Sequence, residues 1–123
     1  MARSKDERDE RRRRYWRGHL AEWVAAAVLI AKGYRILARR QKTPAGEIDL
    51  IAVRGNRIAF VEVKRRLTLE DAQASITERQ GQRVRRAADL WLARHPGYQA
   101  HEIGFDLVFL VPRRWPSHIE NGL

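Results

Sequence analysis

The sequence predicts an α/β fold in which a central mixed sheet is flanked by helices. Apolar residues recur at helical spacing over residues 15–32 and again over 78–94, which predicts two helices. Between them, residues 34–65 contain three short apolar segments separated by turn residues, which is typical of a three-strand meander. The apolar run 104–111 ends at Pro112 and predicts a fourth strand. The predicted order is therefore helix, three strands, helix, strand.

The composition supports one folded domain and excludes several classes of protein. With 123 residues, of which 44% are hydrophobic, the chain is long enough to bury a core. It has no cysteine, which excludes disulfides and thiolate metal ligands. No apolar run approaches the roughly 20 residues that span a bilayer, and the charged N-terminus has no signal-peptide pattern. We therefore expect a cytoplasmic protein.

The chain divides into three parts by composition. Residues 1–14 are nearly all charged, and we expect them to form a flexible leader. Residues 15–112 carry the predicted helices and strands and make up the domain itself. Residues 113–123 have no clear period, and we expect this tail to pack on the domain through Trp115.

Basic residues outnumber acidic ones. The chain has 25 Lys and Arg residues against 15 Asp and Glu residues, a net charge of +10. Most of these cations are arginines, which bind pairs of phosphate oxygens, so the charge favours nucleic acid as a partner. A well-solvated surface without a specific partner is the alternative.

The predicted first helix is apolar almost all round, so we expect it to be buried against more than one neighbour. Glu22 is its only charged residue between Leu20 and Ala31. This carboxylate lies either at a solvent-facing edge or inside a functional site, and the periodicity leaves both alternatives open.

Threonines mark the starts of two further helices. Thr68 precedes Asp71, and Thr77 precedes Gln80, at the spacing of an N-cap and the third helical residue. This pattern predicts a short helix that begins at Leu69 and a longer one over 78–94.

The most informative residues lie in the second and third predicted strands. Glu47 and Asp49 are two apart, as are Glu62 and Lys64, so each pair projects from one face of its strand. A two-residue hairpin at Gly55-Asn56 would place Asp49 opposite Glu62, and Glu47 opposite Lys64. Two opposed carboxylates repel each other, and a divalent cation between them removes the repulsion. The three strands are predicted over 34–40, 47–53 and 57–65.

This arrangement suits phosphodiester hydrolysis. Carboxylates are the ligands that Mg²⁺ or Mn²⁺ prefers, and such an ion activates water and neutralises phosphate charge. Asp49 and Glu62 are the predicted ligands, with the backbone carbonyl of Val63 as a further candidate. Lys64 would orient the attacking water or stabilise charge in the transition state. The alternative is an exposed cross-strand ion pair between Glu47 and Lys64.

Other candidate groups are weaker. The four histidines share no metal-ligand spacing. Asp106 lies inside the last predicted strand, where a structural role as an ion-pair partner is favoured over catalysis.

Three motifs carry a resemblance to a known family. GYRILARR (33–40), GEIDLIA (46–52) and FVEVKRR (60–66) are similar to the YraN family of uncharacterised bacterial proteins. The chain also resembles the PD-(D/E)xK nuclease superfamily, which includes restriction enzymes and Holliday junction resolvases. The resemblance spans residues 16–111 and implies a restriction endonuclease-like core of order α-β-β-β-α-β. One departure is Ile48, which stands where the superfamily motif has proline.

The resemblance also implies roles for single residues. Asp49, Glu62 and Lys64 match the catalytic positions of the superfamily, and Glu22 falls where related resolvases place a helix carboxylate on the metal. Beside these carried-over roles, we expect Glu47 to tune either Lys64 or the groups around the metal ligands.

We therefore expect a nucleic-acid-binding, metal-dependent endonuclease that acts on DNA rather than RNA, with branched DNA in recombination or repair as the candidate substrate. The expected phosphate contacts come from Arg65, Arg66, Arg79, Gln80, Arg83 and Arg86. By analogy with junction-cutting dimers, a homodimer is considered as well. The alternative is a non-catalytic nucleic-acid-binding module, because a fold does not fix an activity.

Overall fold

A computed structural model describes residues 19–123 of the chain. The predicted leader over residues 1–14 and the beginning of the predicted first helix lie outside this range. No helix among residues 19–123 is long and apolar enough to cross a membrane.

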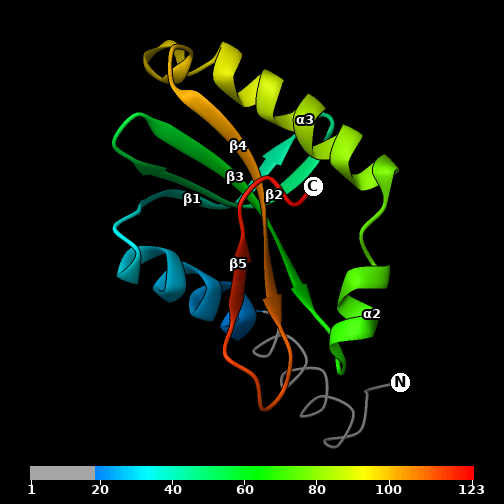
Figure 1. The fold of residues 1–123 in the computed structure, drawn as a ribbon. Coiled ribbons are helices and arrows are strands. Elements are labelled where there is room, and N and C mark those ends of the chain that lie inside the picture. The colour runs from blue at the N-terminus through cyan, green and yellow to red at the C-terminus, as the bar shows by residue number, and fades with distance from the viewer. Residues whose placement is uncertain (1–18) are drawn as a thin grey trace, which may run out of the picture.

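The domain is built on a single mixed sheet (Figure 1). The strands follow one another across the sheet in chain order, and every neighbouring pair is antiparallel except β3 and β4, which are parallel. The connection between these parallel strands holds two helices, as a parallel pair requires. The strands are β1 (Arg35–Thr43), β2 (Gly46–Arg54), β3 (Arg57–Arg65), β4 (Glu102–Leu110) and β5 (Ser117–Ile119). This confirms the predicted α/β class with a mixed sheet.

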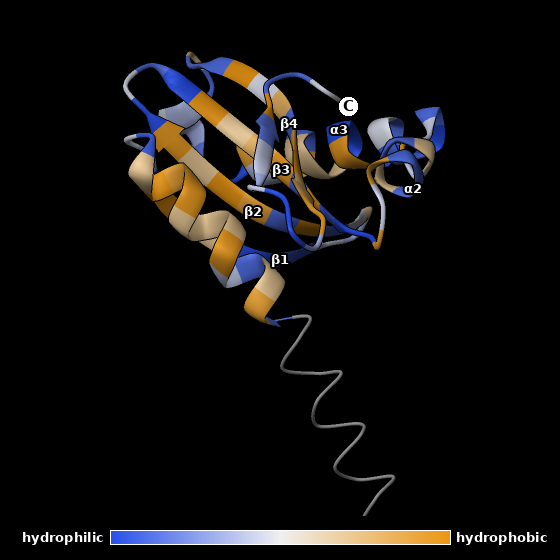
Figure 2. Cartoon of the chain, turned by 60° about the horizontal axis from the view of Figure 1, so that its bottom comes forward, coloured by the Kyte–Doolittle hydropathy of each residue, from blue (hydrophilic) through white to orange (hydrophobic). Residues whose placement is uncertain are grey.

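Helices cover both faces of the sheet, so the domain has three layers (Figure 1). The first helix covers residues 19–31 on one face, and α3 (Glu78–Ala93) lies on the other. The short helix α2 (Leu69–Ala74) and a 3₁₀ turn (Pro96–Tyr98) flank α3 in the chain. Figure 2 shows hydrophobic residues along β2 and β3 and around the first helix.

Each face of the sheet packs against its own apolar core. Small residues of the first helix, among them Ala25 and Ala26, pack on Leu50 and Val61 of the sheet. On the opposite face the contacts come from α3, whose Val84, Ala87, Ala88 and Trp91 pack on Ile48, Ile51, Ile58 and Phe60. Because both faces are covered, the central strands are apolar on both sides.

The predicted caps and the hairpin are confirmed. The hydroxyl of Thr68 accepts a hydrogen bond from the Asp71 amide, and that of Thr77 accepts one from the Gln80 amide. Gly55 has a φ of 56°, the left-handed conformation that a Gly-first hairpin turn requires.

The C-terminal tail differs from its prediction. Residues Ser117–Ile119 form β5, an edge strand too short to show a period in the sequence, which pairs with β4. The prediction that Trp115 packs on the domain is wrong, because its side chain is 92% exposed.

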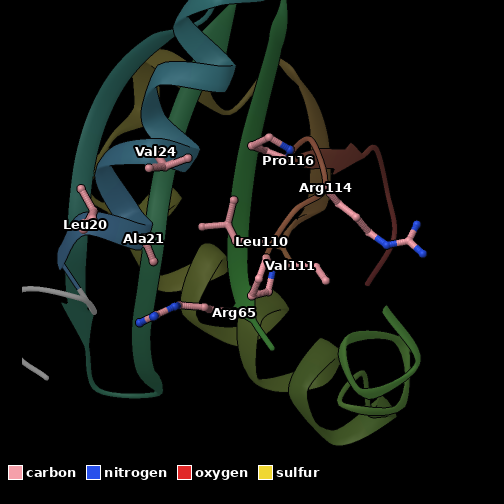
Figure 3. A pocket seen from close by; sticks show the side chains of 9 residues that line it. Leu20, Ala21, Val24, Arg65, Leu110, Val111, Arg114 and Pro116 are labelled. Atoms are coloured by element: carbon pink, nitrogen blue, oxygen red, sulfur yellow. The ribbon is translucent and has the colours of Figure 1, made fainter. Parts of the chain in front are cut away.

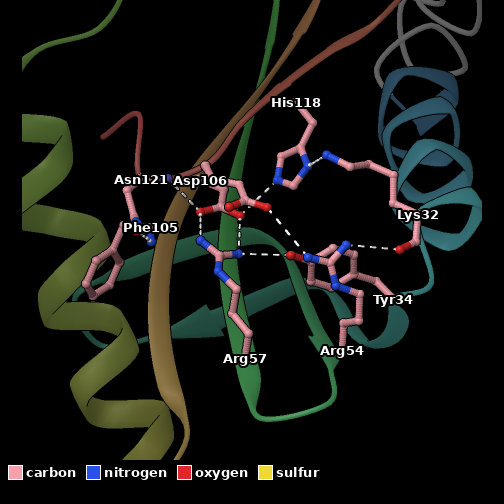
Figure 4. Close-up of polar contacts among 9 residues, drawn as sticks. Lys32, Tyr34, Arg54, Arg57, Phe105, Asp106, His118 and Asn121 are labelled. Carbon is pink, nitrogen blue, oxygen red and sulfur yellow. Dashed lines mark hydrogen bonds and ion pairs between the residues drawn. The ribbon is translucent and has the colours of Figure 1, made fainter.

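Asp106 of β4 is fully buried at the centre of a polar cluster (Figure 4). Arg57 donates two hydrogen bonds to its carboxylate, at 2.7 and 2.8 Å, and a third at 3.0 Å to the Tyr34 hydroxyl. The backbone amide of Asn121 donates to the same carboxylate at 2.9 Å. The structural role that the sequence favoured for Asp106 is therefore confirmed. Gly104 belongs to this arrangement, since a Cβ there would overlap the Arg57 guanidinium.

The same cluster attaches β5 to the domain. His118 Nε2 lies 2.8 Å from Asp106, while its Nδ1 lies 2.6 Å from the Lys32 ammonium (Figure 4). Since an ammonium group only donates, Nδ1 accepts and Nε2 carries the proton that goes to Asp106. Asp106 thus links the end of the first helix, β3 and the C-terminal strand.

Candidate metal centre

The candidate site lies where β2 and β3 separate. The two strands pair from Arg54 opposite Arg57 to Leu50 opposite Val61, in the predicted register. Beyond that point β2 continues along β1 and β3 continues along β4. The gap that opens between them accommodates a polar side chain inside an otherwise apolar sheet.

Asp49 is the first residue of β2 beyond the shared ladder. Its Oδ2 accepts a hydrogen bond of 2.8 Å from the Val63 backbone amide of β3, so its carboxylate bridges the gap between the strands. The sequence predicted the Val63 carbonyl as a metal ligand, and the contact seen at this residue is made by its N–H. Asp49 is thereby fixed at the opening of the sheet.

Three carboxylates converge at this point. One oxygen each from Glu22 of the first helix, Glu47 and Asp49 lies within 4.8 Å of the other two. Glu22 is only 9% exposed, and its Oε2 has no hydrogen-bond partner among residues 19–123. A buried carboxylate oxygen without a donor is unfavourable unless a cation satisfies it. Glu22 therefore lies buried among carboxylates and not at a solvent-facing edge.

Glu62 and Lys64 approach from the other side of the sheet. Val61 packs with the first helix and Phe60 with α3, so alternation places Glu62 and Lys64 on the α3 side. Both are buried, and Lys64 Nζ lies 3.7 Å from Glu62 Oε1. Arg83 of α3 reaches the same oxygen at 3.5 Å. The other oxygen, Oε2, is buried with no hydrogen-bond partner among residues 19–123.

Neither predicted opposition is found in the ladder, that of Asp49 to Glu62 or that of Glu47 to Lys64. The ladder ends before these residues, and Glu47 Oε1 instead lies 3.3 Å from Arg40 Nε. The physical reason is that β2 and β3 separate beyond Leu50, whereas the prediction extended the hairpin register past that residue. Glu47 thereby joins the carboxylate group of Glu22 and Asp49 rather than the ion pair of Lys64.

Burial and mutual repulsion make the carboxyl groups hard to ionise. Burial raises the pKa of Asp49, and the charge of Glu47 adds to that effect, against Lys64 and Arg83. Burial also raises the pKa of Glu62, and here the charge of Asp49 adds to it. The charge of Asp49 therefore acts on Glu62 across the gap. Raised carboxyl pKa values are typical of functional sites.

Arg40 of β1 is the cation that faces the carboxylates next to the first helix. Its Nε lies 3.6 Å from Glu22 Oε1, and its guanidinium contacts His19 at 2.7 Å. Its φ is 52°, a strained conformation for arginine. Regular alternation would turn Arg39 and Arg40 to opposite faces, but with this kink both reach the first helix. Strain of this kind is often kept at functional sites.

Glu22→Gln should stabilise the metal-free protein. Burial raises the pKa of Glu22, and Arg40 only partly offsets this. A raised carboxyl pKa means that the folded chain binds more protons than the unfolded one, so ionisation lowers stability as the pH rises through that pKa. We expect the melting temperature at pH 7, without metal, to rise by roughly 2–6 °C. The gain should vanish below the ordinary carboxyl pKa of 4.5.

Glu120→Gln is the control for this measurement, since Glu120 is an exposed acid that pairs with Arg54 at 3.7 Å. Differential scanning fluorimetry across pH compares the two variants with wild type. A melting temperature lowered by Glu22→Gln would contradict the argument, because it would mean that Arg40 more than compensates the buried charge.

Of the residues predicted to contact nucleic acid, only Arg83 contacts a carboxylate of the candidate site among residues 19–123. Arg83 lies at Glu62, while Arg79 and Arg86 are exposed on α3. Gln80 Oε1 is buried and has no hydrogen-bond partner among residues 19–123. Arg66 donates a hydrogen bond of 2.8 Å to the Arg65 carbonyl.

Arg65 lies apart from the carboxylates. It lines an apolar pocket of about 260 Å³ between the first helix and the ends of β3 and β4, and its side chain extends toward that helix (Figure 3). The other lining residues include Leu20, Ala21 and Leu110.

Arg40 and His19 are site residues that the sequence reasoning missed. Residue periodicity does not distinguish Arg40 from the neighbouring Arg35 and Arg39. The position of the Arg40 side chain depends on one backbone angle. His19 gave a weak signal, since it precedes Glu22 by three residues and so lies on the same side of the helix.

Comparison with known proteins places the chain in a family. A family model described as "Uncharacterised protein family UPF0102" matches residues 21–110. A UPF0102 protein of Chelativorans sp. (strain BNC1) is 54% identical over 111 residues, covering 90% of each chain. One from Mesorhizobium japonicum is 51% identical over 112 residues, covering 91% of this chain and 90% of the relative. The resemblance to the YraN family is thereby confirmed: this chain belongs to the UPF0102 family.

Proposed function

We propose that this protein is a divalent-metal-dependent endonuclease that acts on DNA and shares the restriction endonuclease-like core of the PD-(D/E)xK superfamily. The observation that carries the proposal is the convergence of Glu22, Glu47 and Asp49, whose oxygens lie within 4.8 Å of one another. One of these carboxylates is buried and the other two are half-buried, and carboxylates this close are unfavourable unless a cation lies between them.

The donor set fits a hard cation. All three groups are carboxylates, and such oxygen ligands are those of Mg²⁺ and Mn²⁺. Asp49 and Glu22 would hold the ion, with Glu47 beside them and with Glu62 and the Val63 carbonyl completing the set from β3. When bound, the ion supplies Lewis acidity and lowers the pKa of a coordinated water.

The other side of the gap provides the protein's own catalytic group. Lys64 is 3% exposed and is held by Glu62 at 3.7 Å. An ammonium group in such a dry environment interacts strongly with a developing negative charge. Lys64 would therefore orient the attacking water or stabilise the phosphate in the transition state.

Charge supports nucleic acid as the substrate. The net charge is +10, and arginines lie on both sides of the carboxylates, Arg40 on β1 and Arg83 on α3. Arg79 and Arg86 extend this basic surface along α3. Phosphate contacts of this kind position a substrate without reading its sequence.

Calorimetric titration with Mn²⁺ tests the metal site directly. Wild type should bind Mn²⁺ at one specific site, and Asp49→Asn should weaken that binding by roughly tenfold or more, because it removes one charged ligand. Asp49→Asn retains an oxygen that can accept the Val63 hydrogen bond, so the fold is preserved. Absence of specific Mn²⁺ binding to wild type would refute the enzyme and favour the non-catalytic nucleic-acid-binding alternative.

A further inference from the structure

An exposed tryptophan lies beside the candidate metal centre. Trp23 follows Glu22 on the first helix and is 54% exposed. The guanidinium carbon of Arg39 lies 3.8 Å from the centre of the Trp23 ring, a stacked cation–π contact. An exposed aromatic side chain of this size can stack against the flat ring of a ligand.

The backbone of β1 is distorted in a way that creates this pair. The register of β1 against β2 shifts between Ile36 and Ala38, and Arg40 has its φ of 52°. With these two irregularities, consecutive arginines both contact the first helix, Arg39 at Trp23 and Arg40 at Glu22. An exposed aromatic ring and two arginine cations thus lie on or next to the helix that carries Glu22.

We propose that Trp23 and Arg39 form a platform on which an unpaired nucleobase of the substrate stacks. The proposal rests on the proposed function and specifies its substrate class: a DNA with an unpaired nucleotide next to the cleaved phosphodiester. A base in a continuous duplex is stacked between its neighbours and cannot reach such a surface, whereas an unpaired base at a branch or flap can. Arg40 would contact the adjoining phosphate.

The alternative explanation for the exposed Trp23 is that a second copy of the chain covers it. Leu20 and Ile30 are 59% and 57% exposed on the same helix, and a pair of such helices would bury them together with Trp23. The charged neighbours Arg39 and Arg40 favour a polyanion over a second, equally basic copy. The two explanations predict different effects of Trp23→Ala on the oligomeric state and on DNA binding.

Binding measured by fluorescence anisotropy tests the platform, with Ca²⁺ in place of Mg²⁺ to prevent cleavage. The substrates are a labelled DNA with a single-stranded flap and a duplex of the same length. Trp23→Ala should weaken flap binding by about tenfold and duplex binding far less, because one base–aromatic stack is worth about 1–3 kcal/mol. Trp23→Phe should restore most of the affinity. Trp115→Ala is the matched control, since Trp115 is 92% exposed and lies on the C-terminal tail.

The outcomes separate this proposal from the proposed function. Unchanged flap binding by Trp23→Ala, or an equal loss for flap and duplex, would overturn the platform while leaving metal binding and cleavage intact. A wild-type dimer that Trp23→Ala converts to a monomer in sedimentation would overturn it in favour of the second copy. Absence of any DNA binding by wild type would refute both proposals.

Discussion

Asp49→Ala should abolish Mn²⁺-dependent cleavage of branched DNA. The substitution removes the carboxylate that lies between β2 and β3 and is one of three within 4.8 Å of one another. We expect the cleavage rate to fall by roughly a thousandfold, which corresponds to about 4 kcal/mol of transition-state stabilisation. Denaturing electrophoresis of an end-labelled branched substrate, under single-turnover conditions, measures the rate.

Two variants make this result interpretable. Asp49→Asn keeps an acceptor for the Val63 amide, so loss of cleavage in this variant separates catalysis from folding. Asp89→Ala removes an exposed acid of α3 and should cleave like wild type. Equal residual cleavage by wild type and Asp49→Ala would show that the activity belongs to a contaminating nuclease.

Asp106→Ala should cause the largest loss of stability. Its carboxylate accepts two hydrogen bonds from Arg57, which is 9% exposed, and it contacts His118 at 2.8 Å. Removing one partner of a buried ion pair leaves the other charge uncompensated, which destabilises a protein by about 3–5 kcal/mol. Urea unfolding at pH 7 measures the change. Asp89→Ala should change stability by less than about 0.5 kcal/mol, and a similar value for Asp106→Ala would contradict the argument.

The Asp106 contribution should also disappear in acid. Burial alone would raise the pKa of Asp106, but hydrogen bonds from Arg57, Asn121 and His118 hold it below the ordinary value of 3.8. A lowered carboxyl pKa means that the unfolded chain binds more protons, so the stabilisation is present above 3.8 and is lost as the pH falls through the folded-state pKa. The difference in unfolding free energy between wild type and Asp106→Asn should therefore shrink below that pH.

Local sequence signals predicted most of the fold because they act over short distances. Thr68 and Thr77 have their predicted capping bonds, and β3 has the predicted bounds Arg57–Arg65. The hairpin register holds from Arg54 to Leu50 because a two-residue turn fixes it. The strand β5 escaped prediction, since three residues held mainly by pairing with β4 leave no pattern of their own.

For the candidate site, the sequence supplied the residues and only part of their arrangement. The sequence identified Glu22, Glu47, Asp49, Glu62 and Lys64, and the structure brings them to the gap between β2 and β3. Glu22, Glu47 and Asp49 form one group there and Glu62 and Lys64 another, because the strands separate where a continued hairpin would keep them paired. Arg40 reaches the candidate site because of one strained backbone angle, and residue types alone do not predict such an angle.

The sequence by itself determined the α/β class, the helix caps, the hairpin and the chemical character of the site, since periodicity and residue type are local properties. The tertiary structure decided which carboxylates lie close together and that Glu22 faces inward. It also decided that Arg40 and Trp23 lie beside these carboxylates. Those facts depend on how the first helix packs across β1 and on where β2 leaves β3. Packing and strand divergence arise from contacts between distant parts of the chain, and therefore no local pattern contains them.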